Sequence, residues 1–291
     1  MNQPAQHPAR ELGRTGLSLF PIGLGAMPLS LSGRPDYPAA LEVVRAALDA
    51  GVNLIDTANA YCLNDSETGH NERLLGRALR DLGAMEKVLV ATKGGFTRPG
   101  GSWTPDGRPE SLQRACEQSL KDLGMECIGL YQFHVPDSRV PYADSIGAMA
   151  RLQEQGKVRH IGLSNVNTSQ IDQALSIVRV ESVQNRCSPY DQGDLGNGVL
   201  DHCKAKGLTY IPWSPVGGGY GHKRLGQDRA LKEIGGKYGV SAYQVALAWL
   251  LELGPHVLPI PGASRVSSIT DSAAAAALHL SQEDQQTISR I

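Results

Sequence analysis

The sequence predicts the α/β class and, within it, a single (β/α)8 TIM barrel with an N-terminal β-hairpin and an extra C-terminal helix. Short apolar runs alternate with longer amphipathic stretches, and this strand–helix unit recurs eight times within 291 residues. No linker, repeat or low-complexity tract interrupts the pattern, so one domain over residues 1–291 is expected. An open, doubly wound sheet is the alternative that the same alternation allows.

The chain is expected to begin with a hairpin over residues 10–19, because Gly13 and Gly16 mark a turn between two short runs. Short apolar runs, which are typical of strands buried on both faces, then predict eight parallel strands. These strands are expected at residues 20–24, 52–56, 87–92, 127–133, 158–163, 180–184, 208–212 and 256–260. Helices are expected at about 38–50, 70–82, 109–123, 141–155, 168–178, 197–206, 226–253, 266–275 and 281–290.

Composition narrows the class of function. Hydrophobic residues make up 41% of the chain and charged residues 20%, as in an ordinary globular protein. The formal net charge is -1, which argues against a nucleic-acid partner held through phosphate contacts. No apolar run approaches the ~18 residues of a membrane span, and the polar N-terminus lacks a signal-peptide core. A small-molecule partner is therefore expected, with no membrane and no nucleic acid.

The five cysteines are not spaced as Cys-x-x-Cys, and their number is odd. A disulfide framework or a structural zinc site is therefore not expected. We interpret the cysteines as small buried apolar side chains in a reducing compartment, which predicts a cytoplasmic protein.

Polar residues close several of the expected strands. Asp56, Lys93 and His134 follow three successive strands, at the end of a barrel where active sites gather. Other strands end in Ser164-Asn165, Gln184 and Trp213-Ser214. Tyr61 lies five residues beyond Asp56, on a loop that can fold back over the barrel. Taken singly, each of these residues could equally be a helix cap, a packing aromatic or a surface charge. Three ionisable groups at the ends of adjacent strands, however, indicate a functional site.

These residues and their surroundings resemble an aldo-keto reductase along nearly the whole chain. The resemblance rests on Asp56-Thr-Ala-Asn-Ala-Tyr61, Lys93, His134, Gly156-Lys-Val-Arg-His-Ile-Gly-Leu-Ser-Asn165 and Ile260-Pro-Gly-Ala-Ser-Arg265. It implies a (β/α)8 barrel that transfers hydride between a nicotinamide cofactor and a carbonyl or alcohol. It also implies that the protein is an enzyme, an NADP-dependent oxidoreductase.

The resemblance assigns catalytic roles to four residues. Tyr61 is the general acid, and Lys93 stabilises its phenolate and lowers its pKa. Asp56 pairs with Lys93, and His134 donates a hydrogen bond to the carbonyl oxygen. This chemistry needs no metal, and the sequence contains no His-x-His or carboxylate cluster to hold one.

The cofactor residues are also implied by resemblance, because the sequence has no Rossmann fingerprint. The run that begins Gly23-Leu-Gly25 has Pro28 in place of the third glycine. The nicotinamide end is assigned to Asp56, Gly25, Ala26, Met27, Ser164, Asn165, Gln184 and the stacking ring of Trp213. The phosphates and adenosine are assigned to Ser214, Pro215, Val216, Gly218, Gly262, Ala263, Ser264, Arg265 and Asp271. Arg265, beside an expected helix N-terminus, favours the 2′-phosphate of NADP(H) over NAD.

The chain departs from the family pattern in three places. Trp213 stands where many members have tyrosine, and Asp271-Ser272 stands where they often have Glu-Asn. The sequence also stops at Ile291, without the long C-terminal loop that covers the substrate in some members. We therefore expect the βα loops to wall the pocket, through Met27 and residues 62–69, 96–103 and 135–137.

Other functions stay open at this point. A cofactor-binding regulatory barrel, like the channel-associated β subunits of the superfamily, is one alternative. A barrel hydrolase is another, although the Gly-x-Ser-x-Gly elbow is missing. Within the enzyme class, a pyridoxal-type reductase and a sugar or general aldehyde reductase are both compatible with the sequence, which leaves the oligomeric state open.

Overall fold

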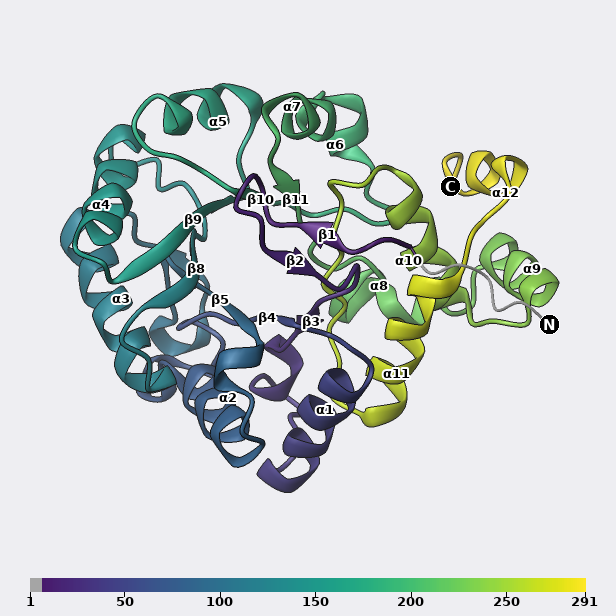
Figure 1. Cartoon of the computed structure of the whole chain (residues 1–291), viewed down its shortest axis with the longest axis horizontal. Helices are drawn as coiled ribbons and strands as arrows, with labels where there is room; N and C mark the ends of the chain where they lie inside the picture. Colours follow the sequence, from purple (N-terminus) through teal and green to yellow (C-terminus); the bar gives the residue numbers. More distant parts are fainter. Residues whose placement is uncertain (1–6) are drawn as a thin grey trace.

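A computed structural model describes residues 7–291 and contains a parallel sheet whose strands follow the order β11-β10-β9-β8-β5-β4-β3. The strands run in parallel and curl into a ring (Figure 1). They are β3 (Leu24–Gly25), β4 (Leu54–Asp56), β5 (Leu89–Gly94), β8 (Ile128–Phe133), β9 (Val158–Ser164), β10 (Ser182–Gln184) and β11 (Thr209–Tyr210).

The segment after Gly254 closes the ring between the two edge strands. On one side Tyr210 N–H donates to the His256 carbonyl at 2.8 Å, and on the other Gly25 N–H donates to the Pro261 carbonyl at 2.9 Å. The predicted strand at 256–260 is wrong in detail, because Pro259 and Pro261 carry no N–H and the segment forms only isolated bridges. The sheet is nevertheless closed on both sides, which confirms the (β/α)8 barrel and excludes the open sheet.

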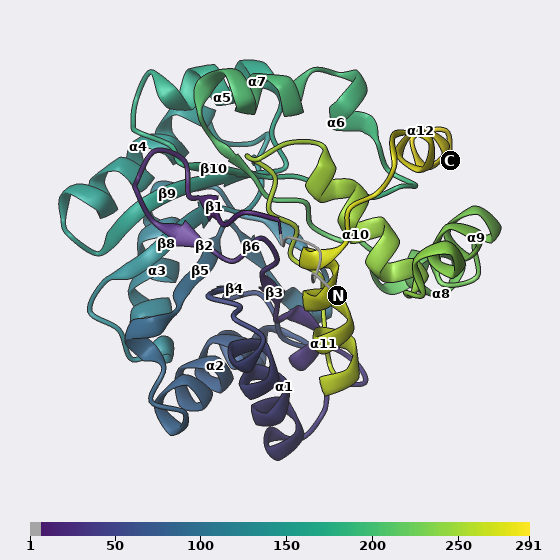
Figure 2. The same cartoon turned by 45° about the vertical axis from the view of Figure 1, so that its right-hand side comes forward.

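Helices surround the strands on the outside (Figures 1 and 2). They are α1 (Tyr37–Asp49), α2 (His70–Asp81), α3 (Pro109–Leu123), α4 (Tyr142–Glu154), α5 (Thr168–Leu175), α6 (Gly193–Gly196), α7 (Val199–Lys206), α8 (Gly218–Leu225), α9 (Arg229–Tyr238), α10 (Ala242–Glu252), α11 (Val266–Ala274) and α12 (Gln282–Ile288). Short 3-10 turns are η1 (Met27–Leu29), η3 (Met85–Lys87) and η5 (Ala275–Ala277). None of these helices combines the length and apolar composition needed to cross a membrane.

Two further expected elements differ from the structure. The helix predicted over 226–253 is divided into α9 and α10, because Gly239 caps α9 in the left-handed region at φ 69°. The first strand begins at Leu24 rather than Phe20, and Pro21 lacks the N–H that a paired strand there would use. The described cysteines are all unpaired, as the sequence analysis expected.

The predicted N-terminal hairpin seals one end of the barrel. Its strands are β1 (Arg10–Glu11) and β2 (Ser18–Leu19), and it lies across the ring in Figure 1. Leu12 and Leu19 are buried against Leu54, Leu130 and other apolar residues at the starts of the barrel strands. Since the amino end is plugged, the site must lie at the carboxyl end.

Two loops at the carboxyl end contain structure of their own. The loop after β5 folds into a second hairpin, β6 (Phe96–Thr97) and β7 (Thr104–Pro105), joined by η4 (Pro99–Gly101). The loop after β4 contains η2 (Asp65–Glu67), and the Gly100 N–H donates to Asp65 Oδ1 at 3.4 Å across the two loops. These elements bring residues 96–103 over the mouth of the barrel.

Candidate active site

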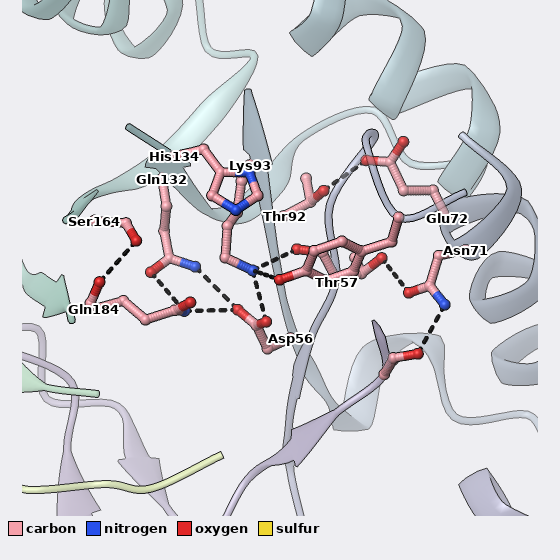
Figure 3. A network of polar contacts seen from close by, with 12 residues as sticks. Asp56, Thr57, Asn71, Glu72, Thr92, Lys93, Gln132, His134, Ser164 and Gln184 are labelled. Atoms are coloured by element: carbon pink, nitrogen blue, oxygen red, sulfur yellow. Dashed lines mark hydrogen bonds and ion pairs between the residues drawn. The ribbon is translucent and has the colours of Figure 1, made fainter. Parts of the chain in front are cut away.

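The four predicted catalytic residues meet at the carboxyl end of neighbouring strands. Asp56 is the last residue of β4, Lys93 lies in β5, and His134 directly follows β8. Tyr61 returns to them from the loop after β4, with its ring centroid 5.9 Å from that of His134. Figure 3 shows Asp56, Lys93 and His134 turned toward one another.

Lys93 is completely buried, and its ammonium group has a full set of acceptors. Nζ donates to Asp56 Oδ2 at 2.6 Å, to the Thr57 carbonyl at 2.8 Å and to the Tyr61 hydroxyl at 3.0 Å. An ammonium has three N–H donors, so these three bonds exhaust its capacity. Lys93 thus donates to the phenolic oxygen, which leaves the O–H of Tyr61 as that side chain's own donor.

The electrostatics of Tyr61 correct one expectation. Burial, and after it the Asp56 carboxylate, raise the Tyr61 pKa well above its ordinary value, so lowering by Lys93 is not the net effect. Burial also lowers the Lys93 pKa, while the neighbouring Asp56 opposes that change. Tyr61 is therefore a protonated phenol near neutral pH.

His134 is an uncharged imidazole at this site. Burial, followed by the charge of Lys93, lowers its pKa well below the usual histidine value. Nδ1 is buried and has no hydrogen-bond partner in residues 7–291. A neutral imidazole beside Tyr61 can donate one hydrogen bond to an incoming oxygen without adding charge.

Two glutamines hold the second oxygen of Asp56. Oδ1 accepts from Gln184 Nε2 at 2.8 Å and from Gln132 Nε2 at 3.2 Å (Figure 3). The sequence analysis named Gln184 but missed Gln132. The available signal was a single polar residue inside the apolar run 127–133, whose inward direction the sequence alone did not show.

The residues assigned to the nicotinamide end are hydrogen-bonded to one another. Asn165 Nδ2 donates to the His134 carbonyl at 2.9 Å and to Ser164 Oγ at 3.1 Å, and its Oδ1 accepts from Trp213 Nε1 at 3.2 Å. Asn165 and Ser214 have φ of 58° and 52°, the only positive values among non-glycine residues of the described chain. Such backbone strain is concentrated at functional sites, which supports these two strand ends as part of the site.

A second polar layer lies behind the site, and the sequence analysis missed it. Thr57 Oγ1 donates to Asn71 Oδ1 at 2.6 Å, so α2 fixes the residue whose carbonyl holds Lys93. Thr92 Oγ1 donates to Glu72 Oε1 at 2.5 Å. Glu72 forms no ion pair within residues 7–291, and burial raises its pKa to about 7. This layer anchors α2 to the strands that carry Asp56 and Lys93.

Aromatic rings cover the mouth above Tyr61 and His134. Trp103 lies with its centroid 6.2 Å from Tyr61 and 5.5 Å from Phe96, and 41% of Trp103 is exposed. The Arg98 guanidinium stacks on Trp103 at 3.9 Å and donates to the Leu63 carbonyl at 3.2 Å. The loops 62–69 and 96–103 therefore contact each other beside Tyr61, and their role as walls of a substrate pocket stays a prediction.

The remaining predicted cofactor residues lie in three places. Gly25 and Gly262 pack where the ring closes, and a Cβ on Gly25 would lie 2.8 Å from the Ile260 carbonyl oxygen. Ala26 and Met27 follow Gly25, with Ala26 N–H bonded to the Asp56 carbonyl. The phosphate candidates lie between β11 and the first residue of α8, and before α11; they are Ser214, Pro215, Val216, Gly218, Ala263, Ser264 and Arg265.

Asp271 lies on α11, and its carboxylate is engaged by α10. It accepts from Ser241 Oγ and Gln244 Nε2, both at 2.7 Å. The predicted adenine contact of Asp271 would therefore share a side chain that already joins two helices.

Comparison with known proteins agrees with this geometry. The family model described as "Aldo/keto reductase family" matches residues 21–291. Pyridoxine 4-dehydrogenase of Escherichia coli (strain K12) is 34% identical over 281 residues, which cover 93% of this chain and 94% of that protein.

Solved structures share the fold along nearly their whole length. A thermostable aldo-keto reductase in complex with the inhibitor epalrestat has a TM-score of 0.83 and 29% identity, covering 97% of this chain and 98% of that one. An aldo/keto reductase from Klebsiella pneumoniae in complex with NADP and acetate has a TM-score of 0.79 and 25% identity, covering 98% and 95%. With the family model spanning the barrel and its mouth, this chain belongs to the aldo/keto reductase family of oxidoreductases.

Proposed function

We propose that this protein is an NADP(H)-dependent reductase that converts an aldehyde or ketone to an alcohol, with Tyr61 as the general acid. The 3.0 Å contact between Lys93 Nζ and the Tyr61 hydroxyl carries the proposal. This contact places the Lys93 ammonium beside the buried Tyr61 phenol. When Tyr61 donates its proton, the ammonium would stabilise the phenolate that remains.

The residues at the mouth fit a nicotinamide cofactor. Ser164, Asn165 and Gln184 supply polar atoms for a carboxamide, and the half-buried Trp213 supplies a ring face for stacking. The bound cofactor would supply the hydride. Support for NADP also comes from the Klebsiella relative that was solved with NADP.

Arg265 is the proposed contact of the 2′-phosphate. It is exposed at the N-cap of α11, and no residue in 7–291 is hydrogen-bonded or ion-paired to its guanidinium. The Val266 and Ser267 N–H groups in the first turn of α11 would add donors for a phosphate. A guanidinium and a helix N-terminus facing one phosphate favour NADP over NAD.

Proton transfer follows from the charges already described. As hydride reaches the carbonyl carbon, the carbonyl oxygen becomes an alkoxide, a stronger base than a phenolate. Tyr61 can give up its proton to that base despite its raised pKa, and Lys93 then stabilises the phenolate. In the oxidative direction the phenolate accepts the proton from the alcohol.

His134 and Asp56 complete the arrangement. The neutral imidazole of His134 would donate to the carbonyl oxygen and align it with Tyr61. Asp56 keeps Lys93 charged and directed at Tyr61 through the 2.6 Å ion pair. Because the imidazole is uncharged, the transferred proton comes from Tyr61.

A pyridoxal-type substrate is the first aldehyde to test. Two observations favour it: the pyridoxine 4-dehydrogenase relative at 34% identity, and the aromatic cover formed by Phe96 and Trp103. A planar heteroaromatic aldehyde would pack against such rings. Sugars and general aldehydes follow in the same screen.

The test incubates the purified protein and NADPH with pyridoxal, aldehydes, ketones and sugars. The loss of NADPH absorbance measures the oxidation of NADPH. We expect turnover of at least one carbonyl. Tight NADPH binding without turnover of any carbonyl would instead favour the cofactor-binding regulatory barrel. Cytoplasmic localisation stays a prediction that this assay does not address.

A further inference from the structure

Gln132 and Gln184 form a continuous amide bridge across the bottom of the proposed nicotinamide site. Both side chains are buried, at 0% and 2% exposure. Gln184 Nε2 donates to Gln132 Oε1 at 3.1 Å, and both amide nitrogens donate to Asp56 Oδ1 (Figure 3). The bridge therefore connects β10 and β8 to the carboxylate that holds Lys93.

The chemistry of the acceptor fixes the orientation of both amides. Asp56 is ion-paired to Lys93, so its oxygens only accept hydrogen bonds. Each glutamine must then turn its NH2 group toward Oδ1, and the Gln132 oxygen is left to accept from Gln184. In this orientation the two N–H donors of Gln184 are both used within the protein.

The same orientation leaves one acceptor unused. No residue in the described chain donates to Oε1 of Gln184, although Ser164 Oγ donates to its main-chain carbonyl at 2.7 Å. An amide N–H of a bound carboxamide is a fitting donor for that oxygen. A contact there would be transmitted through the Gln184 amide to Asp56.

We infer that Gln132 is a positioning residue, and that the amide bridge couples occupation of the nicotinamide site to the charge state of the Asp56–Lys93–Tyr61 relay. The inference rests on the proposed function. The hydrogen bond that Gln132 donates to Asp56 Oδ1 offsets part of the carboxylate charge, and that charge raises the Tyr61 pKa, so loss of the Gln132 amide should raise the Tyr61 pKa further. Gln132 Oε1 also accepts a hydrogen bond from Gln184 Nε2. Removing the Gln132 amide should therefore weaken the contact between Gln184 and the nicotinamide carboxamide.

The test removes the Gln132 amide and measures both ends of the bridge. Gln132→Met keeps the length of the side chain without its polar atoms. Tyr131→Phe is the matched control, because it changes the neighbouring strand residue, whose hydroxyl contacts the Leu112 carbonyl of α3. Gln132→Asn, which keeps an amide but withdraws it by one methylene, is the second variant in case the methionine variant fails to fold.

The first readout is the pH profile of alcohol oxidation, which requires the phenolate. We expect its rising limb to shift by about one pH unit to the alkaline side in Gln132→Met, with roughly tenfold slower oxidation near neutral pH, as the loss of one charge-assisted hydrogen bond implies. Tyr131→Phe should keep the wild-type profile. An unchanged profile in a folded Gln132 variant would overturn the inference and leave the proposed function intact.

The second readout is binding, by quenching of tryptophan fluorescence, and it needs no turnover. We expect Gln132→Met to weaken NADP⁺ by about three- to tenfold. Adenosine 2′,5′-bisphosphate, which lacks the nicotinamide, should bind as it does to the wild type. Equal weakening of both ligands would show a general structural defect and contradict the bridge. If no carbonyl is ever turned over, the proposed function fails, and this comparison still decides whether the bridge exists.

Discussion

The ammonium of Lys93 lies 3.0 Å from the phenolic oxygen of Tyr61 while it is ion-paired, at 2.6 Å, to Asp56. All of its N–H groups are used, since the third donates to the Thr57 carbonyl. Lys93 is thus rigidly held between an anion and a neutral acid. In the proposed mechanism its charge would stabilise the Tyr61 phenolate, so the pair would serve both reduction and oxidation.

Replacing Lys93 should slow alcohol oxidation in particular, because oxidation needs the Tyr61 phenolate. In Lys93→Met the Tyr61 phenolate loses its cation, so the Tyr61 pKa should rise further above its already raised value. Alcohol oxidation, which needs the phenolate, should fall by about 10²-fold or more at neutral pH and partly recover in alkali. Initial rates across pH measure this.

Lys87→Met, which changes an exposed lysine just before β5, is the control for that variant. The buried Asp56 charge left unpaired should also lower stability, by about 3–5 kcal/mol. Thermal unfolding therefore accompanies the rates. If a folded Lys93→Met protein keeps both the oxidation rate and its pH profile, Lys93 does not act on Tyr61.

Glu72 should make stability depend on pH. Burial raises its pKa from 4.5 to about 7, so the folded state keeps a proton that the unfolded state releases between those values. The free energy of unfolding should therefore fall as pH rises from about 4.5 to 7. Glu72→Gln removes this effect. The free energy of unfolding of the variant minus that of the wild type should therefore increase by up to about 3 kcal/mol from pH 5 to pH 8.

Urea unfolding at several pH values measures that difference. Glu86→Gln, at an exposed glutamate in η3, should show no comparable pH dependence. A constant difference between Glu72→Gln and the wild type across this range would mean that Glu72 is already ionised in the folded protein.

Arg265 should determine the choice of coenzyme. A charge-assisted bond to a phosphate is worth roughly 1.5–3 kcal/mol, or about ten- to over a hundredfold in affinity. Arg265→Ala should weaken NADPH within that range and leave NADH nearly unchanged, because NADH has no 2′-phosphate. Titration of both coenzymes by tryptophan quenching, with exposed Arg290→Ala as control, measures the effect. An equal loss for both coenzymes would mean that Arg265 only supports its loop.

Local signals predicted most of the barrel. The bounds of α3 agree with the expected 109–123, because Pro109 begins the helix and Gly124 ends it at φ 70°. The prediction failed for two elements. Gly239 divides the helix expected over 226–253, and Pro259 and Pro261 interrupt the strand expected over 256–260. The closed ring depends on pairing between residues over 200 positions apart, which apolar periodicity does not encode.

The site was predictable where a residue's position on its strand was enough. Asp56, Lys93 and His134 follow or end adjacent strands, and the geometry brings them together. Gln132 and Glu72 were missed because both lie within elements. In a strand that is buried on both faces the apolar run does not reveal which residues point inward.

The most direct test of the account is carbonyl reduction by Tyr61→Phe under saturating NADPH. Tyr142→Phe, which removes a phenolic oxygen on α4, is the matched control. We predict that Tyr61→Phe lowers the reduction rate by about 10²–10⁴-fold, the usual contribution of one acid–base group, while NADPH affinity stays within a few-fold of the wild type. Turnover at the wild-type rate in a folded Tyr61→Phe protein would show that another group delivers the proton and would contradict the proposed mechanism.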